Sequence, residues 1–491
     1  MPSQQPAPRS APAIAPALAV ASSAFALYVA TLAPSLGWGD GAELQRLAVT
    51  GGDRVDAHAH PMWLWLASLF ARLPFGEPTW RVNLSSAVFG AIAVALVYLA
   101  AERLTRRRSA SALGALALAV SHTFWLHAVQ TEVYALFMAL LALILFVFAL
   151  GRDLPRPVVL VGMGALTGVT LLSHMLVVTA GPGLAVGAWA IAPRGRRLRT
   201  LALFIAGGLA GMALFVAVAG LNPFLHPVYG KGGPFSILEP PGAGDLVRWA
   251  AFALYQFPLA LPLALWGAWT TLRVDRPLAA TLLLVALGDI GFTLCFRVPD
   301  EYVFYLPSYL VAALFVALGV AALPEGWRRG VGLAALSLAL VLAPPLIYRA
   351  APSLAETTRA LVNPRTLPGR DNARFFLDPP KRGERSADRF AREAFRALPE
   401  SSFVLADWAP LEALQYVQEV DHLRPDLALM ESRPSYAPQL DTLVQLSRTR
   451  PVFIADDEPP PYYDVAGMRR HFDLVPFGPL YRLVPRRGGE R

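Results

Sequence analysis

Two carboxylates near the start of the chain are the first candidates for chemistry. Asp40 and Glu43 lie three residues apart in "APSLGWGDGAELQRL" (33–47), directly after the apolar run 13–33. A positioned carboxylate can take the proton of an attacking hydroxyl, which accelerates a reaction typically by about 10²- to 10⁴-fold. We interpret Asp40 as a candidate general base. Glu43 is a candidate orienting or substrate-contacting partner, because it would share a face with Asp40 if this loop is helical.

The residues around Asp40 favour a binding site over a plain solvated loop, which is the alternative interpretation of the two acids. Gly37, Gly39 and Gly41 permit close approach of the backbone to a ligand. Trp38 offers an aromatic face on which a sugar ring can stack.

A metal site is the competing chemistry for this loop. Asp53, Asp56, His58 and His60 are oxygen and nitrogen ligand types within one short segment. Their spacing alone is weak evidence, and no helix places His58 and His60 on one face. We therefore predict no metal and no other cofactor, and interpret Asp53 and Asp56 as exposed loop residues.

Composition shows which elements must position these acids. Hydrophobic residues make up 55% of the 491 residues and charged residues only 16%, which indicates a polytopic membrane protein. The formal net charge of +8 does not indicate a nucleic-acid partner, because the arginines gather in short clusters between apolar segments. The single cysteine, Cys295, excludes an intramolecular disulfide and a cysteine-type zinc cluster.

Apolar segments of spanning length predict about eleven transmembrane helices. They are 13–33, 82–101, 109–128, 132–150, 157–173, 174–192, 199–220, 248–272, 277–296, 303–323 and 331–349. A cleaved signal peptide is the alternative for the first, although the run is longer than the usual apolar region of such a peptide.

Arginine-rich loops alternate with arginine-poor ones along the chain, which predicts the orientation. The rich loops are 102–108, 151–157, 193–199, 272–276 and 325–330. The positive-inside rule assigns them to the cytoplasm, so the first loop (34–81), which carries Asp40, faces outward. Within that loop, residues 60–76 are apolar, short and bounded by prolines, which is typical of an interfacial helix. A packing element without a role in binding is the alternative.

After residue 350 the long apolar runs stop, so we divide the chain into a membrane domain (1–350), a linker (351–385) and a C-terminal domain (386–491). The patterns predict helices at 387–398 and 410–420 and buried strands at 402–406 and 451–455. A small α/β domain on the outer side of the membrane is the result.

Several short segments, in their order along the chain, resemble the bacterial protein O-mannosyltransferase-like membrane family of the GT-C glycosyltransferase superfamily. They are "TLAPSLGWGDGAEL" (31–44), the His-Pro pair at 60–61, "FGEPTWRVNLSSAVFGAIAVALVY" (75–98), "TFWLHAVQTEVYAL" (123–136), "LLSHMLVV" (171–178), "VPDEYVFYLPSYLVAAL" (298–314) and "LADWAPLEALQYVQEVDHLRPDL" (405–427). One departure is that Pro61-Met62-Trp63-Leu64 replaces the family's Pro-Pro-Gly-Tyr-Pro. The shape of the donor or acceptor site is therefore expected to differ.

The resemblance implies a GT-C fold, a bacterial inner-membrane location and transfer of a mannose-like sugar. The donor would be linked to polyprenyl phosphate, and the acceptor would be a hydroxyl of a protein or glycan outside the cytoplasm. A transporter or flippase of lipid-linked sugars is the alternative, in which outer acids couple protons. Transporters usually carry ionisable residues near the middle of spans. Asp289 is the one clear case here, which favours the enzyme.

The leaving lipid phosphate calls for a cation, and arginine matches phosphate oxygens best. Arg297 is the preferred candidate because its neighbourhood also matches the family, whereas a membrane-interface anchor is its alternative role. Arg81, Arg248 and Lys231 are the other outer cations. The complete set of predicted substrate-binding residues is Trp38, His60, Arg81, Glu132, His174, Arg297, Asp300 and Tyr305.

Overall fold

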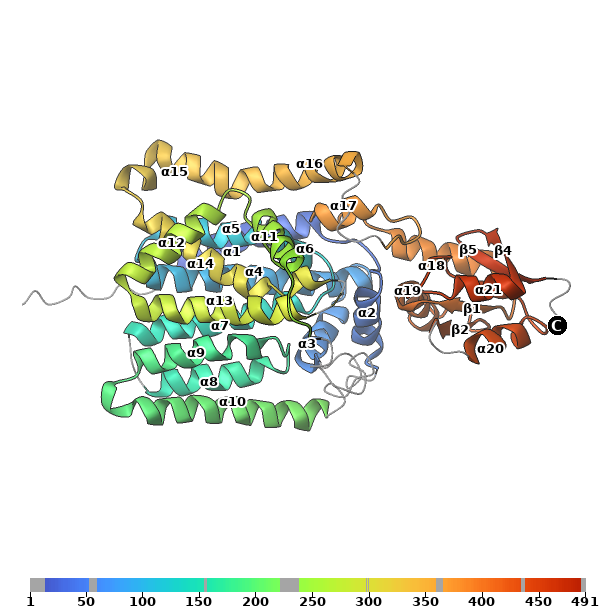
Figure 1. The fold of residues 1–491 in the computed structure, drawn as a ribbon, viewed down its shortest axis with the longest axis horizontal. Coiled ribbons are helices and arrows are strands. Elements are labelled where there is room, and N and C mark those ends of the chain that lie inside the picture. The colour runs from blue at the N-terminus through green and yellow to red at the C-terminus, as the bar shows by residue number, and fades with distance from the viewer. Residues whose placement is uncertain are drawn as a thin grey trace, which may run out of the picture.

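The computed structural model describes residues 14–52, 60–153, 157–220, 238–296, 298, 300–358, 365–433 and 438–486. A bundle of long helices forms the larger part of the molecule, and a small α/β domain stands at one end of it (Figure 1).

Each of the eleven predicted apolar segments coincides with a helix or with a pair of helices. The long ones are α1 (Ile14–Thr31), α4 (Pro78–Thr105), α7 (Tyr134–Asp153), α10 (Arg197–Ala219), α13 (Arg276–Cys295), α14 (Leu306–Ala322), and α15 (Gly330–Ser337), which continues through Leu338–Leu342 into α16 (Ala343–Thr358). The bent pairs are α5 (Arg108–Ala119) with α6 (His122–Ala128), at 68°, and α11 (Ala243–Gln256) with α12 (Leu261–Val274), at 101°. The shorter helices are α8 (Pro157–Thr170) and α9 (Val177–Ile191).

Within the described part of the chain, seven helices are long and apolar enough to cross a membrane, or up to nine if each bent pair is one span. The polytopic helical fold is therefore confirmed. Eleven crossings stay a prediction, because α8 and α9 have only 14 and 15 residues.

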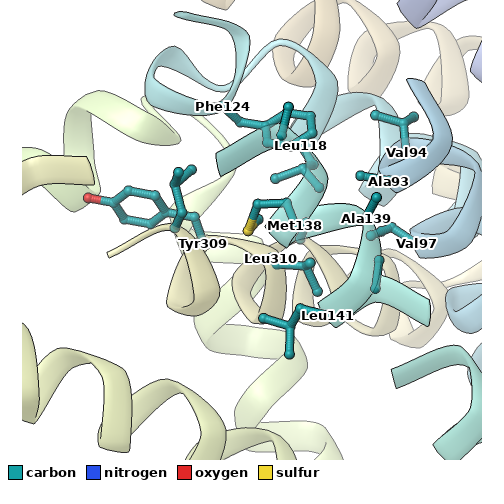
Figure 2. Packing of buried hydrophobic residues seen from close by; sticks show 14 of the residues in the cluster. Ala93, Val94, Val97, Leu118, Phe124, Met138, Ala139, Leu141, Tyr309 and Leu310 are labelled. Carbon is teal, nitrogen blue, oxygen red and sulfur yellow. The ribbon is translucent and has the colours of Figure 1, made fainter. Parts of the chain in front are cut away.

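The centre of the bundle is packed from α4, α5, α6, α7 and α14. Figure 2 shows alanines, valines and leucines of these helices interlocked with Phe124 and Met138. Small residues allow helices to approach closely where lipid supplies no hydrophobic drive for association. At the crossing of α12 and α14, for example, a Cβ on Gly267 would lie 1.9 Å from the carbonyl oxygen of Phe315.

Loops rich in arginine gather at one end of the bundle. Asp153 accepts from Arg106 at 2.6 Å and lies 3.5 Å from Arg103, and Arg152 pairs with Asp275, so three of these loops are joined. Figure 1 shows the α9–α10 and α12–α13 connections at the end away from the α/β domain. The shared side agrees with the alternation expected from the sequence, and its assignment to the cytoplasm stays a prediction.

The C-terminal domain is an α/β fold, as predicted. Its strands are β1 (Phe403–Ala406), β2 (Ala428–Glu431), β3 (Val452–Ile454), β4 (Phe472–Phe477) and β5 (Leu480–Pro485), in the order β2-β1-β3-β5-β4. Its helices are α18 (Ser386–Ala397), α19 (Trp408–Glu419), α20 (Pro438–Leu446) and α21 (Val465–His471). β1 runs parallel to both β2 and β3, whereas β5 is antiparallel to β3 and β4.

The predicted helices and strands of this domain are α18, α19, β1 and β3, whereas β2, β4, β5, α20 and α21 were not anticipated. The domain boundary at residue 386 stays a prediction. The predicted linker holds the end of α16 and a short helix, α17 (Asn372–Leu377).

The first loop forms two helices between the bundle and the α/β domain, α2 (Asp40–Thr50) and α3 (Pro61–Ala71) (Figure 1). On α3, Trp63 and Leu64 are buried, while Trp65 is 54% exposed and Leu69 43% exposed. The interfacial position of α3 stays a prediction. One buried face and one exposed apolar face are consistent with it.

Candidate active site

A cavity of about 550 Å³ lies between the end of the bundle and the α/β domain. Its wall combines the first loop, the turn before α7, the segment before α14, α17 with the segment before it, and one edge of the C-terminal sheet. Residues that line this cavity include Trp38, Asp40, Asn83, His127, Thr131, Glu132, Tyr134, Asp300, Arg365, Arg370, Phe375, Phe376, Asp407, Trp408 and Tyr462.

Asn83 of α4 holds the first loop in place from the side of the helical bundle. Its Nδ2 donates to the carbonyl oxygens of Ala33, at 2.9 Å, and Ser35, at 3.2 Å. Its Oδ1 accepts from Gln45 Nε2 at 3.0 Å and from Thr131 Oγ1 at 2.6 Å. Since a fully satisfied buried polar network fixes one arrangement, this amide ties the loop, α2 and the turn before α7 together.

Gly39 places Asp40 at the start of α2. Its φ of 53° is a left-handed conformation, and a Cβ there would lie 2.9 Å from the Trp408 ring. Its backbone N–H donates to the Ala409 carbonyl oxygen at 3.2 Å. Asp40 is then the first helical residue, where the positive end of the helix dipole stabilises a negative charge.

Three carboxylates of the bundle side meet in the cavity wall, those of Asp40, Glu132 and Asp300. Burial raises the pKa of Glu132 well above its usual value, and the charges of Asp40 and Asp300 add to the rise. Burial also raises the pKa of Asp300. A carboxyl group whose pKa is raised in this way keeps its proton to higher pH and can then donate a hydrogen bond.

Arg365 has a structural place in the wall. Its side chain is 6% exposed, pairs with Asp407 and lies 3.0 Å from Asp456. The guanidinium also stacks over the Tyr462 ring, 4.0 Å from its centroid. Asp407 and Asp456 follow β1 and β3, so Arg365 fastens the segment before α17 to the edge of the sheet.

Arg370 is the cation of the wall with room for a ligand. Its Nε donates to Asn372 Oδ1 at 2.8 Å, and its guanidinium stacks on the rings of Phe375 and Phe376 at 4.6 and 5.1 Å. Burial lowers the pKa of Arg370 to about 10. Within the described ranges no carboxylate forms an ion pair with it. Arg370 Nη2 also donates to the Arg365 carbonyl oxygen at 3.2 Å. A phosphate in this cavity would therefore meet a guanidinium that neutral groups hold in place and that no acid of the described chain pairs with.

Aromatic and imidazole groups complete the wall. Trp38 Nε1 donates to Ser386 Oγ at 2.7 Å, and its ring packs on Phe390 with centroids 5.3 Å apart. His127 lies with Nδ1 4.0 Å from the Glu132 carboxylate, and neither of its buried ring nitrogens has a hydrogen-bond partner among the described residues. Trp38 and His127 thus present a stacking face and an imidazole beside the acids.

His60 and His174 form a layer behind the wall. Their rings stack with centroids 5.0 Å apart, and His174 packs on Tyr134, which lines the cavity, at 5.2 Å. The ring N–H at Nδ1 of His60 donates to the Ser173 carbonyl oxygen at 2.6 Å. The two histidines support the cavity through Tyr134 and are absent from its described wall.

Three other predicted residues also lie outside the described wall. Glu43 lies on α2 near Glu412. The pKa of Glu412 is raised to about 7, chiefly by burial; the charge of Arg46 opposes this rise and the charge of Glu43 adds to it. Arg81 donates to a backbone carbonyl oxygen of its own loop. Tyr305 is buried among aromatic rings of α11 and α14.

The remaining cation predictions have different outcomes. Arg248 pairs with Asp245 and Glu301, so its charge is compensated. Arg297 and Lys231 lie outside the described residues. Their roles stay predictions.

The metal alternative rested on Asp53, Asp56 and His58, which also lie outside the described residues, and on His60. Among the residues that are described, no group of three or more His, Cys, Asp and Glu side chains could hold a metal ion.

Sequence reasoning missed the contributions of Arg365, Arg370, Asp407 and Tyr462. The two arginines lie in a stretch that was interpreted as linker, and the other two lie in the C-terminal domain. Only the tertiary contact across the cavity reveals them, because no local pattern marks residues that follow strands on a docked domain.

The helical bundle with its docked α/β domain has a GT-C-like fold, which solved structures share. The crystal structure of ArnT from Cupriavidus metallidurans bound to undecaprenyl phosphate matches 96% of this chain and 98% of its own, with a TM-score of 0.62 and 15% identity. The structure of the arabinofuranosyltransferase AftD from Mycobacteria matches 97% of this chain and 40% of its own, with a TM-score of 0.51 and 14% identity.

In sequence, residues 57–191 match the family model of the protein O-mannosyl-transferase TMEM260 N-terminal domain. The protein O-mannosyl-transferase TMEM260 of Mus musculus is 35% identical over 120 residues, which are 24% of this chain and 17% of that protein. The resemblance to protein O-mannosyltransferases is confirmed over this segment. It contains Glu132 and His174, whereas Asp40 and Asp300 lie outside it.

Proposed function

We propose that this protein is a membrane glycosyltransferase that moves mannose from a polyprenyl phosphate to a hydroxyl of a protein or glycan on the outer side of the membrane. The observation that carries the proposal is the place of Asp40, at the start of α2 in the wall of the cavity between the bundle and the α/β domain. The GT-C fold and the match to protein O-mannosyl-transferases supply the reaction class. The undecaprenyl phosphate bound by ArnT supports a polyprenyl phosphate as the carrier.

In the proposed reaction the acceptor oxygen attacks the anomeric carbon of the donor sugar. The bond from that carbon to the phosphate oxygen breaks, and its electron pair leaves with the lipid phosphate. Asp40 takes the acceptor proton as the new bond forms. Arg370 stabilises the charge on the departing phosphate with two parallel hydrogen bonds.

Glu132 keeps its proton in this scheme. Since burial raises its pKa and Asp40 raises it further, its neutral carboxyl group donates a hydrogen bond to a sugar hydroxyl. A second negative charge at this position would repel the donor phosphate. Trp38 supplies the face on which the sugar ring stacks.

The α/β domain faces the acceptor in this proposal. Asp407 and Tyr462 line the cavity beside Trp408, and Asp407 directly follows β1. Ligands of open α/β sheets bind at the carboxyl ends of parallel strands, and here this edge is turned toward Asp40. The domain would therefore close the cavity and offer polar groups to the incoming acceptor.

The transporter alternative has less support. Asp289, the acid inside α13, accepts from the Ser308 backbone N–H at 3.0 Å in the first turn of α14. That contact fastens α13 to α14, which gives this acid a structural role.

The test is transfer by the purified protein in lipid nanodiscs. Radiolabelled polyprenyl-phosphate mannose is supplied with an acceptor, and labelled product and released lipid phosphate are followed together. Equal amounts of both are expected, and both should form about 10²- to 10⁴-fold more slowly with Asp40→Asn. Movement of the intact donor between leaflets without release of lipid phosphate would replace the enzyme by the transporter. A reporter fused after residue 491 should be active only outside the cytoplasm.

A further inference from the structure

A second cavity, of about 510 Å³, lies beside the first and has its own chemistry. Its wall is built from the end of α1, Trp125 in the middle of α6, the first half of α16, α17 and the segment 378–389. Phe375 and Glu384 belong to the walls of both cavities. No step of the proposed reaction uses the second cavity.

This cavity is strongly basic. Its wall carries Arg349, Arg374, Lys381, Arg382, Arg385 and Arg389, against Asp371, Asp378 and Glu384. The positive groups exceed the carboxylates by three. Asp378 lies 3.9 Å from Arg374, and no ion pair joins Arg349, Arg382 or Arg385 to a carboxylate of the described chain. A surplus of this kind favours an anion with more than one charge.

Lys381 shows that the surplus is built into the fold. Its side chain is 3% exposed, and its Nζ donates to the carbonyl oxygens of Asp378, at 2.6 Å, and Pro379, at 3.2 Å. Its backbone N–H donates to the Thr31 carbonyl oxygen at 2.7 Å, at the end of α1. Its Nζ also lies over the Phe375 ring, 5.1 Å from the centroid, so carbonyl oxygens and an aromatic face hold the amino group in the wall. Burial lowers the pKa of Lys381 to about 7, which a bound anion would reverse.

The wall on the side of α16 changes from apolar to basic within one turn. Leu342 and Leu346 are exposed by 59% and 68%, in a helix of spanning length and composition. Leu346 and Arg349 both line the cavity. An occupant that fits both surfaces has an anionic head among the arginines and an apolar chain along α16.

We propose that this basic cavity binds the phosphomonoester headgroup of a membrane lipid, whose chain lies along α16. A phosphomonoester carries close to two negative charges and three acceptor oxygens, which suits several arginine forks better than the single charge of a phosphodiester. The identity of the lipid rests on the proposed function: it is the polyprenyl phosphate released by sugar transfer. This lipid passes from the cavity that holds Asp40 to the adjacent basic cavity before it leaves the protein.

Native mass spectrometry of the detergent-purified protein counts the lipids bound. Polyprenyl phosphate should bind to wild type with a stoichiometry of two, and phosphatidic acid should occupy one site. The double variant Arg382→Gln with Arg385→Gln should lose one polyprenyl phosphate and weaken phosphatidic acid roughly 10- to 100-fold. Arg396→Gln is the matched control, because Arg396 is exposed on α18 and does not line this cavity. It should leave both lipids unchanged.

Several results would overturn the inference. Phosphatidylglycerol bound as tightly as phosphatidic acid would remove the preference for a phosphomonoester. If inorganic phosphate bound as tightly as the lipid, the lipid chain would contribute nothing to binding, and its proposed contact with α16 would be refuted. Unchanged binding in the double variant would remove the site itself.

A kinetic arm separates the carrier role from the proposed function. In a single turnover the double variant should transfer sugar at the wild-type rate, while its multiple-turnover rate should fall because lipid release slows. Equal multiple-turnover rates in variant and wild type would refute the carrier role and leave the lipid site standing. The failure of wild type to transfer sugar would instead refute the proposed function, and the binding measurements would still decide the site.

Discussion

Replacement of Asp40 by asparagine is the sharpest test of the catalytic reading. The substitution keeps the size and polarity of the side chain but removes the base. Loss of general base catalysis predicts a fall in turnover of about 10²- to 10⁴-fold, which is roughly 2.7 to 5.4 kcal/mol of transition-state stabilisation. The fold should survive, because a charge at a helix N-terminus contributes only about 0.3–1 kcal/mol.

The surroundings of Asp40 add a second, independent readout. The negative charge of Asp40 contributes to the raised pKa of Glu132, after the larger effect of burial. Asp40→Asn removes that contribution, so the pKa of Glu132 should fall and the group should ionise at lower pH. Donor binding should therefore survive at low pH and weaken earlier than in wild type as pH rises, because an ionised Glu132 repels the phosphate.

The assay measures transfer and donor binding on the same nanodisc preparation across pH. Glu43→Gln is the matched control on the same helix, and it should cost less because Glu43 lies outside the described cavity wall. Wild-type turnover in Asp40→Asn would refute the general-base role and favour the transporter. Activity abolished by chelation and restored by manganese or magnesium would instead make Asp40 a metal ligand, with Asp56, His58 or His60 as companions.

Three further outcomes are expected. Arg370→Ala should raise the donor KM, and lysine should restore part of the loss, since a point charge lacks the two-pronged geometry; an unchanged KM would exclude the phosphate contact. Arg365→Met should lower the free energy of unfolding by about 3–5 kcal/mol, because Asp407 loses its buried partner, whereas the exposed Arg433→Ala should change it by less than about 1 kcal/mol; calorimetry compares them. Burial raises the pKa of Glu412 to about 7 from 4.5, so the folded state binds the extra proton and wild-type stability should fall relative to Glu412→Gln as pH rises from about 4.5 to 7; parallel melting curves would contradict this.

The elements that hydropathy and periodicity specify were predictable from the sequence. Each apolar run became a helix, and the strands at 402–406 and 451–455 lie next to each other in the centre of the sheet. The hairpin of β4 and β5 was missed although its signal was present. Gly478 and Pro479 separate two runs of strand-forming residues, and Gly478 takes the positive φ of 58° that such a turn uses.

Among the candidate site residues, the acids were predicted from the sequence more successfully than the cations. Asp40, Glu132 and Asp300 were predicted as site residues, and the structure puts all of them in one cavity wall. Arg365 and Arg370 could not be predicted, because a Pro- and Arg-rich stretch between two domains has the composition of a linker. Arg365 pairs with Asp407 and Asp456, 42 and 91 positions after it. The contacts of Arg370 are with near neighbours in the sequence, and only the docked domain makes that local cluster part of a cavity wall.

The first loop and the α/β domain form one packed unit, which changes what the domain means for catalysis. Leu36 and Ala42 are buried in the same cluster as the core of the α/β domain, and Ser35 Oγ donates to the Glu384 carbonyl oxygen at 3.2 Å. Gly39 contacts Trp408 so closely that no other residue fits without a shift. Removal of residues 380–491 would therefore expose the underside of the loop that carries Asp40. Asn83 holds the same loop from the side of the bundle, so Asp40 is positioned from both sides of the cavity, and loss of the domain would remove one of its two supports.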